Sequence, residues 1–436
     1  MEENKVEKQS ADATQNGHCA EHNSPHHLGE HHLPDIGKQS RICYMIARVV
    51  CGVVSKFLFK PKVIRNELKG KRGPLVVIAN HQAAYDFVNM IGLTRQRMTF
   101  VISDSFYESL PIKGFLKKLG VIPKQQFQTT LRDMRCIRSV IDHREILTIY
   151  PAGLMCEDGL STPIPPATYQ FLKWIKADIY MAKTSGTYFA MPKWADNKRR
   201  GRTYMDVYKL FSKEELDGME IEEIKERTDR ALLFDAYREQ EDLRVKYRGG
   251  ENIEGLENVL YTCPNCKSEF TIKAKNGNIL YCESCGFEHT SDEYGFLHNS
   301  GNVGEEIRYP SDWSRMVDDI LRDEIERGEI SELSSRAEIH MINYEKHKFE
   351  HAGEGVITLR EGHFNIVGEI DGESIDIDVP TDNFASLPFK PGKYIEIQHG
   401  TDIYRCILED GRLAAKFINM VQIFYARHMA SCAKGR

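Results

Sequence analysis

Apolar runs alternate with stretches of helical periodicity from residue 75 to about residue 245, and this alternation restricts the fold most strongly. Short apolar runs are typical of buried strands, whereas the segment 131–141 has its apolar residues at helical spacing. Strands that alternate with helices form a largely parallel sheet. We therefore expect an α/β domain whose ligands gather at one edge of the sheet. The expected strands lie at 75–79, 98–102, 120–122, 146–150, 179–182 and 204–208.

The apolar run 75–79 is followed by the sequence NHQAAYD at 80–86. His81 then lies at a strand end, and Asp86 can reach its ring from the first turns of a following helix. A carboxylate in that position fixes the imidazole tautomer, and the histidine can take a proton from a hydroxyl near neutral pH. This chemistry serves acyl, phosphoryl or glycosyl transfer to an alcohol. A chance pairing of one histidine with one aspartate is the alternative that these two residues alone leave open.

Length, charge and cysteine content limit the class of protein. With 436 residues the chain exceeds one ordinary core, so roughly two to four domains are expected. The formal net charge of -6 argues against general nucleic-acid binding. Four of the eleven cysteines form two Cys-x-x-Cys pairs and the others are scattered, which indicates a reducing compartment. The polar N-terminus shows no secretory signal, so we expect the cytoplasm or the cytoplasmic face of a membrane.

Residues 1–38 are polar and carry six of the sixteen histidines. With almost no aliphatic residues, this tail cannot offset the entropy of ordering, and we expect it to be disordered. Metal binding by its histidines is the less favoured alternative.

The segment 43–59 is apolar except for Arg48 and Lys56. A bilayer span needs about twenty apolar residues, and two central cations are costly there, so an interfacial helix fits better. Between residues 41 and 72, nine Lys or Arg stand against one acid, Glu67. We expect this segment to dock on anionic membrane lipids as a peripheral or monotopic anchor. The alternative is a helix packed on its own domain with a solvated basic flank.

From about residue 40 to 240 the chain resembles the glycerolipid acyltransferase superfamily, which includes the lysophosphatidic acid acyltransferases. That family has the block Asn-His-(Arg or Gln)-x-x-x-Asp, matched here by Asn80, His81, Gln82 and Asp86. The resemblance implies that His81 is the general base and that Asp86 orients it. By the same match, Asn80 and Gln82 are assigned to the substrate site.

A second block of that family begins with Gly-x-Ile and leads to an arginine that receives the phosphate of the acceptor. The opening is matched by GVI at 120–122, but the arginine position is Gln126. Lys124, two residues away on the same strand face, is the expected substitute.

The family's third block, Phe-Pro-Glu-Gly, is YPAG at 150–153, with Ala152 in place of the glutamate that helps bind the polar acceptor. A helix or turn beginning there would offer the N–H groups of Gly153 and Leu154 to an anion. The segment 212–216 resembles the one that closes the family's domain after its last strand.

Two Cys-x-x-Cys pairs, formed by Cys263, Cys266, Cys282 and Cys285, are separated by fifteen residues. This spacing predicts a tetrahedral zinc site, and the segment 249–300 resembles a zinc ribbon. We expect the zinc to be structural. A redox dithiol pair and a nucleic-acid-binding ribbon are the alternatives.

The rest of the chain divides by its periodicity. Residues 301–348 are charged with a helical apolar stripe, which predicts a helical connector. Residues 349–432 hold short β-rich runs followed by a helical pattern, which predicts a small all-β domain capped by a C-terminal helix. This last part looks like a pleckstrin-homology domain, with scaffolding as its default role and lipid headgroup binding as the alternative.

Together these patterns predict an acyltransferase-like α/β domain at 39–248 with a membrane-docking helix at 43–59. The resemblance implies transfer of a fatty acyl group from a thioester, acyl-CoA or an acyl carrier protein, to a hydroxyl of a lysophospholipid or glycerol-phosphate-like acceptor. Such an enzyme would be similar to a 1-acylglycerol-3-phosphate O-acyltransferase. The alternative is a catalytically degenerate lipid-binding or scaffolding protein on the same fold.

Overall fold

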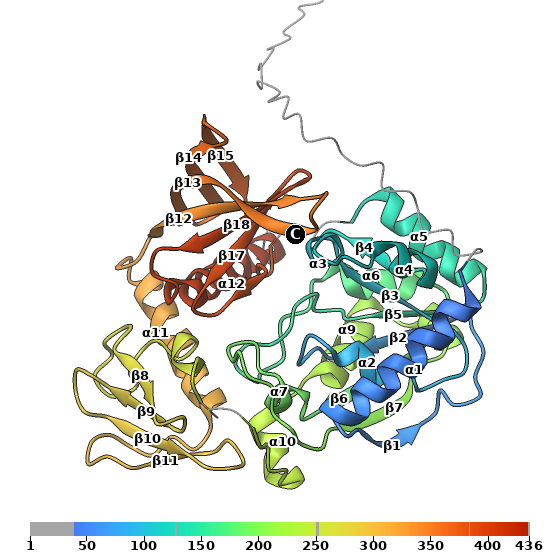
Figure 1. Ribbon diagram of the computed structural model, residues 1–436, viewed down its shortest axis with the longest axis horizontal. Helices are drawn as coiled ribbons and strands as arrows, with labels where there is room; N and C mark the ends of the chain where they lie inside the picture. The colour runs from blue at the N-terminus through green and yellow to red at the C-terminus, as the bar shows by residue number, and fades with distance from the viewer. Residues whose placement is uncertain (1–38, 127–128, 250–252, 383, 435–436) are drawn as a thin grey trace, which may run out of the picture. The chain divides into compact units, whose positions relative to one another are not determined.

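The computed structural model describes residues 39–126, 129–249, 253–382 and 384–434 (Figure 1). The predicted histidine-rich tail at 1–38 lies outside the described residues.

The first part of the chain folds around a seven-stranded sheet with the order β1-β7-β6-β2-β5-β3-β4. All neighbouring pairs are parallel except β6 and β7, so the predicted largely parallel sheet is confirmed. The strands are β1 (Lys62–Asn66), β2 (Leu75–Ala79), β3 (Met98–Ser103), β4 (Ile122–Lys124), β5 (Ile146–Ile149), β6 (Asp178–Ser185) and β7 (Tyr204–Phe211).

Helices cover both faces of this sheet. Successive residues of β2 point to opposite faces, so Val76 packs among residues of α5, α6 and α9, whereas Val77 packs near α2. The helices are α1 (Arg41–Leu58), α2 (Asp86–Met90), α3 (Asp104–Glu108), α4 (Lys113–Leu119), α5 (Leu131–Asp142), α6 (Ala167–Trp174), α7 (Thr187–Ala190), α8 (Lys213–Gly218), α9 (Ile221–Leu232) and α10 (Ala236–Leu243).

One side of helix α1 packs against α2 and α4, and its residues there are small, polar or aromatic (Figure 1). Tyr44 and Ala47 are buried there against Ile91, and the Ser55 hydroxyl donates to Asn89 Oδ1 at 2.6 Å. Its other side carries seven exposed apolar side chains. These are Ile42, Met45, Ile46, Val49, Val50, Val53 and Phe57. Within the described residues, no helix has the length and apolar character that crossing a membrane requires.

The second part is a four-stranded antiparallel sheet with the order β11-β10-β9-β8. A short 3-10 helix, η2 (Leu256–Asn258), precedes it. The strands are β8 (Ile272–Lys275), β9 (Ile279–Cys282), β10 (Glu288–Ser291) and β11 (Leu297–Asn299).

The predicted helical connector at 301–348 is only partly helical. Helix α11 (Pro310–Glu326) buries the stripe that includes Trp313, and a turn at Gly328, with φ of 73°, follows it. Strand β12 (Glu332–Asn343) then occupies most of the remaining segment. Its buried residues alternate with exposed ones, most of which are charged. The charged residues made the segment resemble a solvent-exposed helix, so its period of two was missed.

The third part is an antiparallel sheet with the order β15-β14-β13-β12-β18-β17-β16, followed by α12 (Leu413–Lys434). It therefore begins at Glu332 instead of residue 349. Phe364 and Phe417 are fully buried where the helix meets the sheet. The pleckstrin-homology resemblance stays a prediction. The other strands are β13 (Lys348–Arg360), β14 (His363–Ile370), β15 (Glu373–Pro380), β16 (Phe389–Lys390), β17 (Tyr394–His399) and β18 (Asp402–Leu408).

Candidate functional site

His81 and Asp86 meet where β2 ends and α2 begins. The turn between them returns the chain toward itself, so that His81 Nδ1 lies 3.0 Å from Asp86 Oδ2. Because Nδ1 faces a carboxylate, the neutral imidazole holds its proton on Nδ1 and presents the lone pair of Nε2. A general base needs that free lone pair.

The Asp86 carboxylate is fully buried and held by the backbone. Its Oδ2 also accepts hydrogen bonds from the N–H groups of Gln82 at 2.7 Å and Ala83 at 2.9 Å. Hydrogen bonds to a charged group offset part of the cost of its burial. The carboxylate therefore fixes the loop and the imidazole at the same time.

Tyr150 packs against the face of the His81 ring, whereas Asp86 contacts its edge at Nδ1. It follows β5, the neighbour of β2, and its ring stacks on His81 with centroids 4.2 Å apart and planes at 24°. The phenol donates to Met90 Sδ at 3.1 Å, and burial raises the pKa of Tyr150 well above its usual value. Sequence reasoning left Tyr150 without a role. The aromatic first position of the third block was the available signal.

Asn80 differs from its predicted place in the substrate site. Its amide connects β2 to β6, because Nδ2 donates to the Thr184 carbonyl at 2.8 Å and Oδ1 accepts from the Thr184 N–H at 2.8 Å. The Thr184 hydroxyl donates to the same Oδ1 at 3.0 Å. Asn80 is buried and its amide is engaged on both sides, so it supports the strand end and does not face a ligand.

Gln82 was also predicted in the substrate site, and in the structure its side chain is fully buried. Its Oε1 accepts from the Thr187 hydroxyl at 3.1 Å and from the Tyr188 N–H at 3.3 Å. Gln82 thus fixes the start of α7 beside the 80–86 loop.

The second and third blocks meet through Gln126 and Gly153. Gln126 Nε2 donates to the Gly153 carbonyl at 2.8 Å. Gly153 itself adopts φ of 72°, and its N–H donates to the Tyr150 carbonyl at 2.9 Å. The expectation that this N–H is offered to an anion is therefore wrong for this turn, because the turn itself uses the donor. The next residue, Leu154, is buried.

Lys124 is not the strand-face neighbour of Gln126 that the sequence predicted. Strand β4 ends at Lys124, so the two side chains do not share a pleated segment. Lys124 Nζ donates to the Gln125 carbonyl at 2.9 Å, and burial lowers its pKa.

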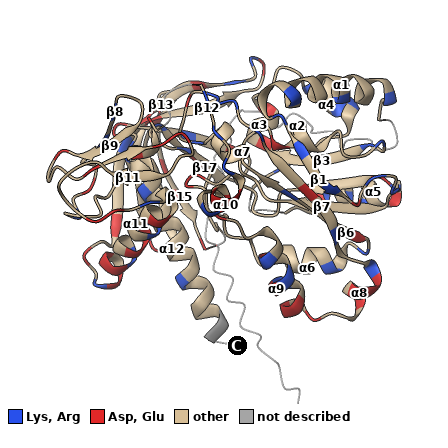
Figure 2. Cartoon of the chain, turned by 90° about the horizontal axis from the view of Figure 1, so that it is seen from below, with Lys and Arg blue, Asp and Glu red and all other residues tan. Residues whose placement is uncertain are grey.

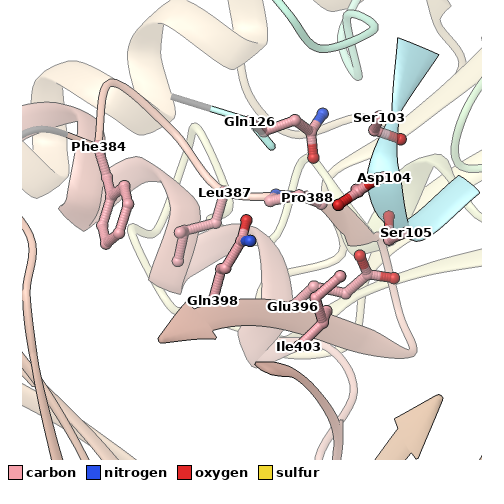
Figure 3. A pocket seen from close by; sticks show the side chains of 10 residues that line it. All are labelled: Ser103, Asp104, Ser105, Gln126, Phe384, Leu387, Pro388, Glu396, Gln398 and Ile403. Carbon is pink, nitrogen blue, oxygen red and sulfur yellow. The ribbon is translucent and has the colours of Figure 1, made fainter. Parts of the chain in front are cut away.

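A hollow adjoins Gln126, and Figure 3 shows the side chains that line it. Asp104 and Glu396 contribute carboxyl groups, and the lining includes no Lys or Arg. Such a lining does not suit a phosphate, so the hollow offers no replacement for the missing arginine.

The four cysteines of the second part converge on one point. Their sulfur atoms all lie within 4.8 Å of one another. Cys263 Sγ lies 3.7 Å from Cys285 Sγ, and Cys266 Sγ lies 3.7 Å from Cys282 Sγ. Tetrahedral zinc with bonds of about 2.3 Å separates its sulfur ligands by about 3.8 Å. The donor set and spacing fit zinc, and each pair crosses from one Cys-x-x-Cys knuckle to the other.

Comparison with known proteins places the acyltransferase signal in the first part of the chain. Residues 60–189 match the sequence model of the family described as Acyltransferase, a segment that contains the 80–86 loop, Gln126 and Tyr150. No match was found among curated proteins.

Among solved structures, the chain is similar to the 1-acyl-sn-glycerophosphate (LPA) acyltransferase PlsC from Thermotoga maritima. The identity is 16%, and the match covers 47% of this chain and 78% of that chain, with a TM-score of 0.37.

Replacing Asn80 by Ala is expected to lower the free energy of unfolding by about 1–3 kcal/mol, because the Thr184 N–H loses its buried acceptor. Urea unfolding measures the change, with the exposed Asn197→Ala as control. Wild-type stability combined with a raised KM in Asn80→Ala would return this residue to the substrate site.

The protein purified without chelator is expected to contain one zinc ion per chain, because four convergent thiolates bind zinc tightly. Cys285→Ser should lower the zinc content and the melting temperature, whereas the exposed Cys432→Ser should change neither. Elemental analysis that finds no zinc in the wild-type protein would contradict the assignment.

Proposed function

We propose that the chain is an acyltransferase that moves a fatty acyl group from a thioester to the hydroxyl of a lysophospholipid or glycerol-phosphate-like acceptor. The observation that carries this proposal is the His81 Nδ1 contact with the buried Asp86 carboxylate. The family match over residues 60–189 supports acyl transfer in preference to phosphoryl or glycosyl transfer.

In the proposed reaction, His81 Nε2 takes the proton of the acceptor hydroxyl as its oxygen attacks the thioester carbonyl. The C–S bond then breaks, and the departing thiolate takes the proton back from the imidazolium. The products are an ester and a free thiol, and no covalent enzyme intermediate forms. Asp86 stays ionised throughout and stabilises the imidazolium.

Coenzyme A or an acyl carrier protein is the proposed carrier of the acyl group, since either supplies a thioester. The acceptor is the less defined partner. Gln126 is committed to the Gly153 carbonyl, and Ala152 has no polar side chain, so neither position supplies a cation or a carboxylate to the acceptor.

These two departures also favour a second candidate, a lipid-binding or scaffolding protein without turnover. Against it stands the catalytic pair, because a buried carboxylate aligned on a partly exposed histidine is costly to maintain for scaffolding alone. His81 is 19% exposed at its side chain, which leaves access to a substrate.

We further propose that α1 anchors the enzyme on the surface of a membrane. Its outward apolar residues recur at intervals of three and four, which places them along one stripe on the side of the helix away from the protein. In Figure 2 this helix carries Lys and Arg but no acidic residue. Insertion of the stripe among acyl chains removes its apolar area from water.

The cysteine cluster is proposed as a structural centre, because α11 rests on it. The indole of Trp313 donates to the Thr262 carbonyl at 2.9 Å, next to Cys263, and its ring meets Phe287 edge-on. Bound zinc would hold the two knuckles together under this helix.

His81→Ala is expected to lower the rate of acyl transfer by about 10²–10⁴, because the acceptor hydroxyl loses its base. Asp86→Asn should lower it too, because the amide does not stabilise the imidazolium. Thiol release and ester formation are measured with acyl-coenzyme A or acylated carrier protein and a panel of lysolipids. The exposed His143→Ala is the control. Wild-type rates in His81→Ala would overturn the mechanism, and no transfer by the wild-type protein with any pair would favour the scaffold.

The triple variant Ile46→Ser, Val50→Ser, Val53→Ser is expected to bind phosphatidylcholine vesicles more than tenfold more weakly, because three apolar side chains no longer insert. Vesicle sedimentation measures binding, and melting temperature checks the fold. Leu131→Ser, Leu233→Ser, Val367→Ser replaces three apolar residues exposed elsewhere and is the control. Equal binding by the two variants would move the anchor away from α1.

A further inference from the structure

We propose that the segment 198–202, together with Arg248, forms a basic surface that binds the anionic headgroups of a phospholipid membrane. This surface, the 198–202/248 surface, consists of Lys198, Arg200, Arg202 and Arg248, all of which are exposed. It is distant in sequence from the basic segment 41–72 that flanks α1.

The fold places this surface next to the end of α1. The Thr203 N–H and hydroxyl donate to the Phe59 carbonyl at 2.9 and 3.0 Å, directly after the helix ends. The Lys62 N–H donates in turn to the Thr203 carbonyl at 2.8 Å. The exposed cations of 198–202 therefore adjoin those of the segment that leaves α1, namely Lys60 and Lys62.

Two arginines are held side by side, and no acid among the described residues forms an ion pair with either. Arg200 and Arg248 exchange both backbone hydrogen bonds of an antiparallel bridge, at 2.7 and 3.0 Å. Like charges directly opposite one another destabilise a strand pair. An anion that binds both side chains removes this repulsion, so the pairing is favourable when a ligand is present.

The backbone of this surface is fixed by buried packing. Tyr247 is buried, and its hydroxyl donates to the Arg202 carbonyl at 2.8 Å. A side chain at Gly201 would come within 2.1 Å of the Tyr247 ring, so the segment fits closely over it. Because the backbone that carries these cations is already fixed, binding costs only the conformational entropy of their side chains.

In the part of the chain that the structure describes, no acid competes for the cations of the 198–202/248 surface. None of the four forms an ion pair with a described acid, and the segment 197–204 contains no Asp or Glu. Arg65, by contrast, is paired with Asp206 at 2.7 Å. Lys198 Nζ lies 5.0 Å from the centroid of the Tyr85 ring, which brings the surface to the 80–86 loop.

An anionic membrane fits these observations better than a soluble phosphate compound. The cations continue from the end of an exposed apolar helix, and an apolar stripe beside a basic flank is the combination that interfacial binding needs. An extended anionic surface can also meet several separate cations, whereas a small phosphate compound reaches only a few of them. Each Lys or Arg near an anionic bilayer adds about fivefold to the affinity.

This inference uses the proposed docking of α1 only for the orientation of the membrane. Binding by α1 and binding by the 198–202/248 surface can be tested separately.

The triple variant Lys198→Gln, Arg200→Gln, Arg202→Gln removes three cations and leaves α1 intact. Lys225→Gln, Arg227→Gln, Arg230→Gln on α9 removes the same charge. Figure 2 shows α9 on the other side of the sheet from α1, and its surface ion pairs contribute little stability.

Binding is measured by sedimentation with vesicles of phosphatidylcholine alone and of phosphatidylcholine mixed with phosphatidylserine. The wild-type protein and the α9 control should prefer the mixed vesicles, and salt should weaken that preference. The 198–202 variant should lose about a hundredfold of its affinity for mixed vesicles and none for phosphatidylcholine.

Two results would overturn the proposal. One is equal binding of mixed vesicles by the 198–202 variant and the α9 control at unchanged melting temperature. The other is a loss confined to the binding of free coenzyme A, measured by equilibrium dialysis, which would assign the surface to the acyl carrier. Loss of phosphatidylcholine binding in the α1 variant alone tests the docking helix, and acyl transfer is not needed for either measurement.

Discussion

The structure of the candidate site depends on one buried carboxylate. Asp86 Oδ2 accepts the N–H groups of Gln82 and Ala83 and faces His81 Nδ1, so a single oxygen atom shapes the loop and aligns the base. A carboxylate buried without those donors would be costly, and the loop would lose its conformation along with the charge. The proposed catalytic role and the local fold therefore depend on the same contact.

The surrounding elements are arranged about this loop. Tyr150 stacks on the imidazole of His81, and the Cys156 N–H donates to the His81 carbonyl at 3.1 Å. The segment after β5 therefore contacts the 80–86 loop at two points. Asn80 and Gln82 secure its other side to β6 and α7. The site holds the proposed proton-transfer pair, but neither Gln126 nor Ala152 supplies a cation that could receive an anion. In our proposal, the cations that meet anionic lipids belong instead to the 198–202/248 surface beside α1, where Lys198 Nζ lies 5.0 Å from the centroid of the Tyr85 ring.

Much of the fold followed from periodicity. The run 75–79 coincides with β2, and helix α5 covers the predicted 131–141. Both were predictable because the apolar residues of a buried strand or helix recur in the sequence at the period of that element. Strand β12 was missed because its outward residues are charged. The hydrogen-bond contacts of Asn80, Gln82 and Gly153 were also missed. A motif shows which residues occur together, but the atoms that they contact depend on neighbouring strands such as β6, which lie far away in sequence.

The protonation of His81 tests the central claim most directly. If Asp86 holds the Nδ1–H, the neutral ring leaves Nε2 unprotonated, and only then can Nε2 take a proton from an acceptor. Nitrogen NMR of histidine-labelled protein, with the His81 signals assigned by their loss in His81→Asn, reports which nitrogen carries the proton. The account predicts the Nδ1–H tautomer at neutral pH in the wild-type protein and its loss in Asp86→Asn. An Nε2–H tautomer in the wild-type protein would contradict it.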